Sequence, residues 1–231
     1  MEKVTVMNIN RRTWLASALA LPMGGCAIQY LPSLATEAVA PPAGDGARVR
    51  PPAVGQVWTY RQFNMFNSAL VATVREQVAS ADAAGVVVRR TADGQAVLPD
   101  EVHAAWGLLR TDPVWDMPLH LMPAAPLWAM GSDPALLPQP GDTRLVHGHY
   151  TVAGGSFAYW VQVYVVVRGW ERVAVGDSVH TALRVERLLR LAHPDATRIE
   201  TQRRDVFWLR PDIGRWVARE TSGRRWFAGL H

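Results

Sequence analysis

His147 and His149 have a spacing that could hold a metal ion. Residues two positions apart lie on the same face of a β-strand, so both imidazoles would point the same way. A metal would need a further ligand, which His103, His120 or His180 could supply only through a tertiary contact. The pattern is more typical of two half-exposed strand histidines, and we predict neither a metal site nor a cofactor.

Gly176, Asp177 and Ser178 could support nucleophilic catalysis. They resemble the nucleophile triplet of a hydrolase family that uses Ser and His, whose serine needs a nearby base and an exposed strand-to-helix turn. Here the triplet falls between two expected strands, where Gly, Asp and Ser are usual hairpin residues. We therefore predict a non-enzymatic protein with no catalytic residue, and keep a serine hydrolase using Ser178 as an alternative.

The acidic residues are scattered along the chain. Asp112 and Asp116 lie in an apolar segment, whereas Glu186 and Glu200 lie on the solvent faces of expected strands, opposite arginines. Cross-strand ion pairs explain the two glutamates better than acid–base catalysis does. The sequence has no phosphate-binding loop and no dinucleotide-binding fingerprint.

Tryptophan is the anomaly of the composition, with 10 residues in a chain of 231. Such side chains either build the core of a small β-domain or line an apolar cleft for a lipid or a similar ligand. Both interpretations stay open. The candidates for lining a cleft are Trp58, Trp106, Trp115, Trp128, Trp160, Tyr164 and Trp208.

The elements that must position these residues are β-strands. Residues 156–168 and 181–191 alternate in polarity, which predicts a hairpin with one buried face. Asp93-Gly94 marks a second hairpin. The fold class that follows is all-β, as a mainly antiparallel curved sheet or open half-barrel. The apolar face of the long hairpin comprises Phe157, Tyr159, Val161, Val163, Val165 and Val167 in the first arm and Leu183, Val185, Leu189 and Leu191 in the second.

Residues 101–141 depart from this alternation. The segment holds seven prolines together with tryptophans and methionines. Because proline disrupts both sheet ladders and helices, the sequence predicts an apolar loop rich in Pro, Met and Trp. We expect its part from Trp106 to Met130 to fold back over one face of the sheet as a lid.

The N-terminus indicates export. Arg11 and Arg12 precede an apolar run too short to span a bilayer, similar to a twin-arginine signal. Met23-Gly24-Gly25-Cys26 resembles the lipobox of bacterial lipoproteins, and the alternative is a secretory signal with a chance cysteine. The resemblance implies a palmitate-type lipid anchor on Cys26. Because Ala27 rather than Asp follows, it also implies the periplasmic face of the outer membrane of a Gram-negative envelope.

The expected domains are a signal peptide over residues 1–25, a lipid-anchored linker over 26–52 and an antiparallel β-domain over 53–227. The linker is assigned because the stretch is rich in Ala and Pro and lacks periodicity. Removing residues 1–25 takes away three basic residues and Glu2, so the net charge falls from +4 to +2. A nearly neutral surface excludes a nucleic-acid partner.

The segments Val54–Arg61, Gly169–Glu186 and Trp208–Glu220 resemble uncharacterised periplasmic and lipoprotein β-domains of proteobacteria. These domains are distantly similar to the open barrels that carry lipoproteins. The resemblance implies a non-enzymatic envelope lipoprotein that binds apolar ligands or partner proteins. The alternative is a lipid or lipoprotein carrier with an aromatic-lined cleft.

Overall fold

The protein, seen in a computed structural model, is built almost entirely of β-strands. The structure describes residues 34–42, 48–65, 67–115, 117–131, 133, 136–192 and 198–227, so the expected signal peptide and Cys26 lie outside the described residues. One short 3-10 turn, η2 (Pro211–Ile213), accompanies the strands. Within the described residues the strands are β1 (Thr36–Ala38), β2 (Val57–Phe63), β3 (Leu70–Asp82), β4 (Gly85–Ala92), β5 (Ala96–Ala105), β6 (Leu108–Asp112), β7 (Leu119–Pro126), β8 (Thr143–Val152), β9 (Tyr159–Val175), β10 (Ser178–Leu191), β11 (Arg198–Arg210) and β12 (Arg215–Phe227).

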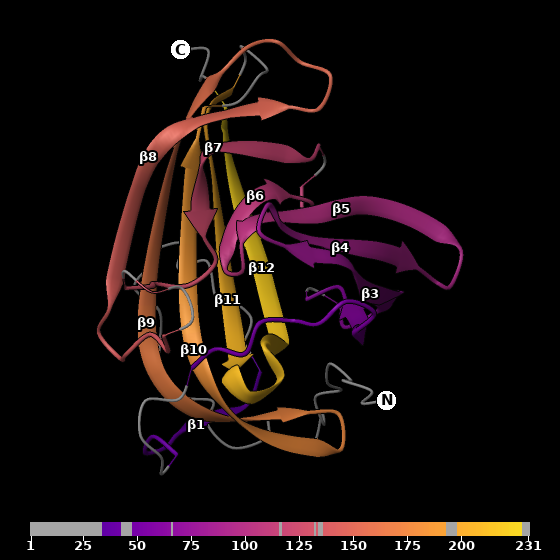
Figure 1. The fold of residues 1–231 in the computed structure, drawn as a ribbon, viewed down its shortest axis with the longest axis vertical. Helices are drawn as coiled ribbons and strands as arrows, with labels where there is room; N and C mark the ends of the chain where they lie inside the picture. Colours follow the sequence, from indigo (N-terminus) through magenta and orange to yellow (C-terminus); the bar gives the residue numbers. More distant parts are fainter. Residues whose placement is uncertain are drawn as a thin grey trace, which may run out of the picture.

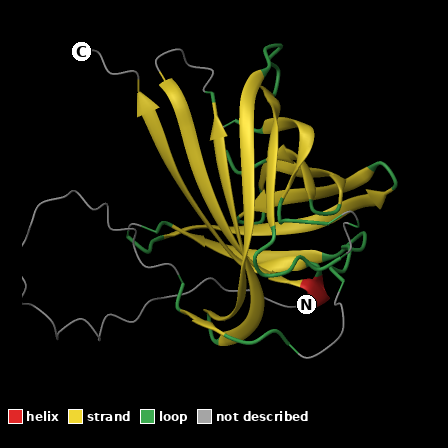
Figure 2. Ribbon diagram, turned by 90° about the vertical axis from the view of Figure 1, so that its left-hand side faces the viewer, coloured by secondary structure: helices red, strands yellow, loops and turns green. Residues whose placement is uncertain are grey.

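The strands β2 to β12 form one antiparallel meander in which each strand pairs with its neighbours in sequence. In Figure 1 the long strands β8 to β12 stand side by side, while β3, β4 and β5 run across the view. The sheet therefore curls into an open half-barrel, and Figure 2 shows the same fan of strands from the side. The predicted fold class is confirmed.

The predicted hairpin is formed by β9 and β10, the two longest strands among the described residues. Val163 lies opposite Leu189 and both are buried on the inner face. The next residues along β9 and β10, Tyr164 and Arg190, are exposed. Strict alternation explains this pattern because successive side chains of a strand point to opposite faces.

The segment 101–141 is not a loop throughout, which corrects the sequence-based expectation. It contains the end of β5 and all of β6 and β7. Pro123 lies where the pairing of β6 with β7 shifts register between Leu109 and Thr111, a position at which a missing N–H is tolerated. Leu127 to Met130 follow β7 and are buried in the core, so this part completes the core instead of forming a separate cover.

The stretch predicted as a linker, residues 26–52, also belongs to the folded unit where the structure describes it. β1 pairs with β9 over Glu171 to Val173 and so extends the edge of the sheet beyond the end of β8. Val49 is fully buried, and the Arg50 N–H donates to the carbonyl of Pro211. The composition, rich in proline and alanine, predicted a tether because it carries no sign of single contacts such as those of Val49 and Arg50.

Two apolar clusters lie on opposite faces of the sheet. The main core fills the concave face and includes Phe207 and Leu209 of β11. The smaller cluster includes Val206 and Trp208, which alternate with them, and is covered by Leu34. In the described residues no helix is long and apolar enough to cross a membrane.

Candidate ligand-binding site

The half-barrel is open between β2 and β12, which are the two ends of the strand order. The two strands approach each other through side chains. The Tyr60 hydroxyl donates to the carbonyl of Trp216 at 3.0 Å, and the two rings are 6.5 Å apart. Gln56 Nε2 donates to the carbonyl of Ile213 at 3.3 Å. Among the described residues β2 and β12 are therefore joined by side chains and not by paired backbone hydrogen bonds. We call the gap between these two edge strands the seam.

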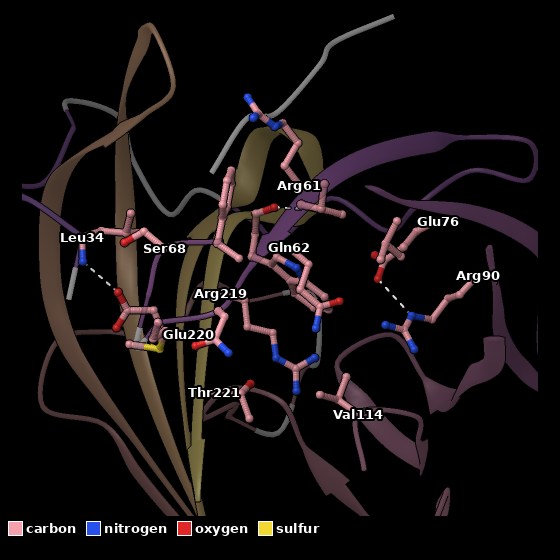
Figure 3. Close-up of a pocket in the computed structure, with 16 residues that line it drawn as sticks. Leu34, Arg61, Gln62, Ser68, Glu76, Arg90, Val114, Arg219, Glu220 and Thr221 are labelled. Carbon is pink, nitrogen blue, oxygen red and sulfur yellow. Dashed lines mark hydrogen bonds and ion pairs between the residues drawn. The ribbon is translucent and has the colours of Figure 1, made fainter. Parts of the chain in front are cut away.

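A pocket of about 260 Å³ lies in this seam. Its walls come from β2 and the turn after it, from β3 and β4, and from β12, so residues far apart in sequence meet there (Figure 3). We call it the seam pocket. Its lining residues are Leu34, Tyr60, Arg61, Gln62, Phe63, Asn64, Met65, Ser68, Val74, Glu76, Arg90, Val114, Trp216, Arg219, Glu220 and Thr221.

The seam pocket combines apolar walls with a few charged groups, as ligand sites commonly do. Glu220 turns toward Leu34 and accepts its backbone N–H at 2.7 Å. Burial raises the pKa of the Glu220 carboxyl above its ordinary value of 4.5, against the backbone hydrogen bond and the positive charges of Arg184 and Arg204. Glu76 is already paired with Arg90 at 3.3 Å.

Behind the pocket, Arg215 is fully buried among aromatic rings and acids. Its guanidinium donates to Glu101 at 2.8 Å and to Glu76 at 2.5 Å, and it stacks 3.4 Å from the centre of the Trp216 ring. Glu101 also bonds to His103 at 2.7 Å. We call Glu76, Arg90, Glu101, His103 and Arg215 the Arg215 cluster.

A second buried cluster joins β6, β10, β11 and β12. Arg187 donates to Asp205 at 2.7 Å and to Asp112 at 3.0 Å, and Arg203 also donates to both acids. Arg219 donates to the other oxygen of Asp205 at 3.1 Å. We call Asp112, Arg187, Arg203, Asp205 and Arg219 the Asp205 cluster; Arg219 is its member in the pocket wall.

The pKa values of Asp112 and Asp205 in one cluster and of Glu101 in the other are lowered, so these three acids are held in the charged form. Burial alone would raise the pKa of Asp205, but the guanidinium groups of Arg203, Arg187 and Arg219 outweigh it and hold that pKa well below 3.8. Burial likewise opposes ionisation of Glu101, and Arg215 and His103 hold its pKa well below 4.5. Ionised acids that accept several hydrogen bonds in a dry interior fix the geometry of the strands that carry them.

The structure brings three of the predicted cleft tryptophans together in the main core. Trp58 and Trp106 lie over the Arg215 guanidinium, 5.2 and 5.6 Å from ring centre to carbon. Trp128 is fully buried and meets Trp106 edge-on at 5.6 Å. These rings fill the half-barrel interior and pack around a cation.

The other predicted cleft residues are dispersed. Trp115 is half-buried over the guanidinium of Arg203, and Trp208 is buried in the smaller cluster, where its indole donates to Glu171 at 2.9 Å. Trp160 and Tyr164 are exposed on the outer face of β9. Of the described residues that line the seam pocket, none is among the seven predicted positions.

The residues considered for chemistry lie apart from the seam pocket. Ser178 is exposed and begins β10 directly after the two-residue turn Gly176-Asp177, in which Gly176 has a φ of 59°. His147 and His149 are both exposed on β8. No group of three or more His, Cys, Asp or Glu side chains that could hold a metal occurs among the residues described.

The expected cross-strand ion pairs are present. Glu186 is paired with Arg168 of β9 at 3.1 Å and with Arg204 of β11 at 2.9 Å, and Glu200 with Arg190 at 2.8 Å. Sequence reasoning missed the buried clusters. The pattern that could have found one of them is in β10, where Arg187 occupies the apolar register between Val185 and Leu189.

Comparison of the chain with protein-family models, with curated proteins and with solved structures found no match. The proposed function is therefore based on the geometry of the molecule alone.

Proposed function

We propose that the protein is a non-enzymatic lipoprotein of the bacterial envelope that binds an apolar ligand in the seam pocket. The observation that carries this proposal is the pocket itself, which lies where the curled sheet fails to close between β2 and β12. An open half-barrel is compatible with a binding or carrier protein. Apolar walls contributed by Phe63, Met65 and Trp216 favour a ligand with a hydrocarbon part.

The ligand is placed in the seam because the rest of the concave face is occupied. Trp106, Trp128 and the buried clusters fill the interior between the strands. A large central cleft lined by aromatic residues, as expected for a carrier of long acyl chains, is thus not the arrangement we favour. A short or slender apolar chain matches a pocket of about 260 Å³.

The proposed anchor is close to this site along the chain. Leu34, whose N–H is held by Glu220, lines the pocket and lies eight residues after Cys26. Eight residues span at most about 29 Å when fully extended. A lipid on Cys26 would therefore keep the pocket near the membrane surface, where apolar ligands are available.

Binding of the neutral dye Nile red and native mass spectrometry of the detergent-extracted protein test the proposal. Met65→Arg replaces an exposed apolar side chain of the pocket wall with a hydrated cation and should weaken dye binding, because the apolar dye loses apolar surface to cover. The matched control is Leu145→Arg, which changes an exposed apolar residue on β8 that does not line the pocket. Equal dye binding by the two variants, together with no retained ligand in the native spectrum, would contradict a ligand site in the seam.

A further inference from the structure

The Asp205 cluster carries one more positive than negative group. Its guanidinium groups belong to Arg187, Arg203 and Arg219, and its carboxylates to Asp112 and Asp205. Asp205 alone accepts hydrogen bonds from all three arginines and from Thr221. Both carboxyl groups remain ionised, so proton uptake does not create this imbalance.

The Arg215 cluster, by contrast, matches its arginines with acids. Arg90 and Arg215 pair with Glu76, and Arg215 also pairs with Glu101. Glu76 is therefore fully engaged and does not compensate the Asp205 cluster. The charge imbalance of the Asp205 cluster reaches the pocket through Arg219 of β12, whose neighbour Glu220 also lines the pocket and is held by the Leu34 N–H.

Arg219 is the arginine of the Asp205 cluster that lines the seam pocket. Figure 3 shows its side chain extending from β12 to a position between Val114 and Thr221. Only its Nη2 is seen donating to an acid, and its buried Nε has no hydrogen-bond partner among the described residues. A buried donor without a partner is unfavourable, and a guanidinium is well shaped to bind a planar or tetrahedral anion.

We propose that the seam pocket takes an amphiphile with an anionic head group, which lies against Arg219 and Thr221 while the hydrocarbon part runs along Tyr60, Phe63 and Trp216. This inference rests on the proposed function, and it specifies the ligand class. A carboxylate or a phosphate monoester would supply the same chemistry. The anion neutralises the excess charge of the cluster, and the apolar part covers the walls of the seam.

Four probes of equal chain length test the inference on the intact protein: decanoate, decyl phosphate, decanol and decyltrimethylammonium. Isothermal titration calorimetry should show either or both anions binding at least about 10-fold more tightly than decanol, because a charge-assisted hydrogen bond is stronger than a neutral one. The cation should bind most weakly. Preference for decanoate or for decyl phosphate identifies the head group.

The outcomes separate the two proposals. If none of the four probes binds, both the ligand site and its anion preference fail. If decanol binds as tightly as both anions, the apolar site stands and the anion inference is overturned. Selectivity of the unmodified protein thus decides the inference without any variant.

Two substitutions locate the head group. Arg219→Gln should weaken decanoate binding by about 10- to 100-fold and leave decanol binding unchanged. Arg61→Gln is the matched control, because Arg61 also lines the pocket but points away from Arg219 in Figure 3. A larger loss of decanoate binding with Arg61→Gln than with Arg219→Gln would overturn the assignment to Arg219. If Arg219→Gln does not fold, the selectivity of the unmodified protein among the four probes remains decisive.

Discussion

Arg187 of β10 and Asp205 of β11 lie directly opposite each other at the buried centre of the half-barrel. Arg187 Nε and Nη2 both donate to Asp205 Oδ2, at 3.0 and 2.7 Å, and both side chains are completely buried. Neighbouring strands in register thereby place opposite charges together in a dry environment, where their attraction is strong. The pair is held among further arginines, so Asp205 is the acceptor on which four donors converge.

Asp205→Asn should destabilise the protein by about 3–5 kcal/mol, because it removes one partner of a buried ionic network and leaves guanidinium groups uncompensated. Urea denaturation followed by circular dichroism measures the loss. The matched control is Glu186→Gln, which removes a carboxylate on the outer face that is paired with Arg168, Arg184 and Arg204. Its effect should stay near or below about 1 kcal/mol. Similar losses for both variants would show that burial of the cluster does not set its contribution.

Stability should fall steeply in acid. The folded-state pKa values of Asp205 and Glu101 are lowered well below their ordinary 3.8 and 4.5, so unfolding takes up protons as the pH drops. The contribution of these two carboxylates to the free energy of unfolding is fully present above about pH 5. It is lost as the pH falls through their ordinary pKa values toward their lower folded-state pKa values. Glu220 acts in the opposite sense, because its raised pKa favours the folded state at low pH.

Free energies of unfolding measured by urea denaturation between about pH 3 and pH 7 test this linkage. The Asp205→Asn variant should show a shallower decline in acid than the unmodified protein, since it lacks one of the groups with a lowered pKa. An unchanged slope in the variant would mean that the pKa of Asp205 is the same in the folded and unfolded states.

Alternation of side chains made the fold predictable. Val161, Val163 and Val165 are each separated by one residue, which is enough to place β9 and its buried face. The strands β6 and β7 were not predicted, because the high proline content of residues 101–141 argues against strands. Pro123 and Pro126 belong to β7 even though proline is unusual in a sheet. Pro123 lies beside the register shift with β6, and Pro126 is the last residue of the strand.

The seam pocket was not predictable in the same way. It depends on which strands end up as edges and on how far the sheet curls, and neither property is local in sequence. Tyr60 and Trp216 meet across the seam although 156 positions separate them. Trp160 and Tyr164 were predicted to line a cleft but are exposed on the outer face. An aromatic residue on a strand can face either side of the sheet, so its type alone does not place it in a pocket.

Val163→Asp should unfold the protein, because it places an unpaired carboxylate in the core at a site that is 1% exposed. The expected loss is several kcal/mol, comparable to the total stability of a domain. Tyr164→Asp is the neighbouring control on the outer face, where the side chain is 42% exposed, and it should cost far less. Thermal melts of the two variants give the comparison, and equal melting temperatures would contradict the observed facing of β9.

If Cys26 carries the proposed lipid anchor, Cys26→Ser should release the protein from membranes into the soluble periplasmic fraction. Each buried CH₂ of an acyl chain contributes about 0.8 kcal/mol to membrane binding, so loss of the lipid has a large effect. Fractionation followed by immunoblotting measures the change, and detergent phase separation of the unmodified protein is the control. An unmodified protein that already partitions into the aqueous phase would contradict the lipid anchor.

Gly214→Ala should detach the N-terminal stretch that contains Arg50 from the sheet. Gly214 follows η2 with a φ of 65°, and a Cβ at this position would lie 2.0 Å from the Arg50 carbonyl oxygen. The displacement would draw the buried Val49 out of the core. The free energy of unfolding should fall by roughly 2–5 kcal/mol, from the strained backbone and the exposed Val49 side chain together.

Gly55→Ala is the control for Gly214→Ala, since Gly55 has a φ of 83° but nothing within 4 Å of the added atom. It should cost only the backbone strain, about 1–2 kcal/mol. Urea denaturation gives the two free energies. Hydrogen exchange should rise at the Arg50 amide, which is bonded to Pro211, in the Gly214 variant alone. If both variants lose the same stability and retain protection at Arg50, the contact between Gly214 and the N-terminal stretch contributes nothing to the fold.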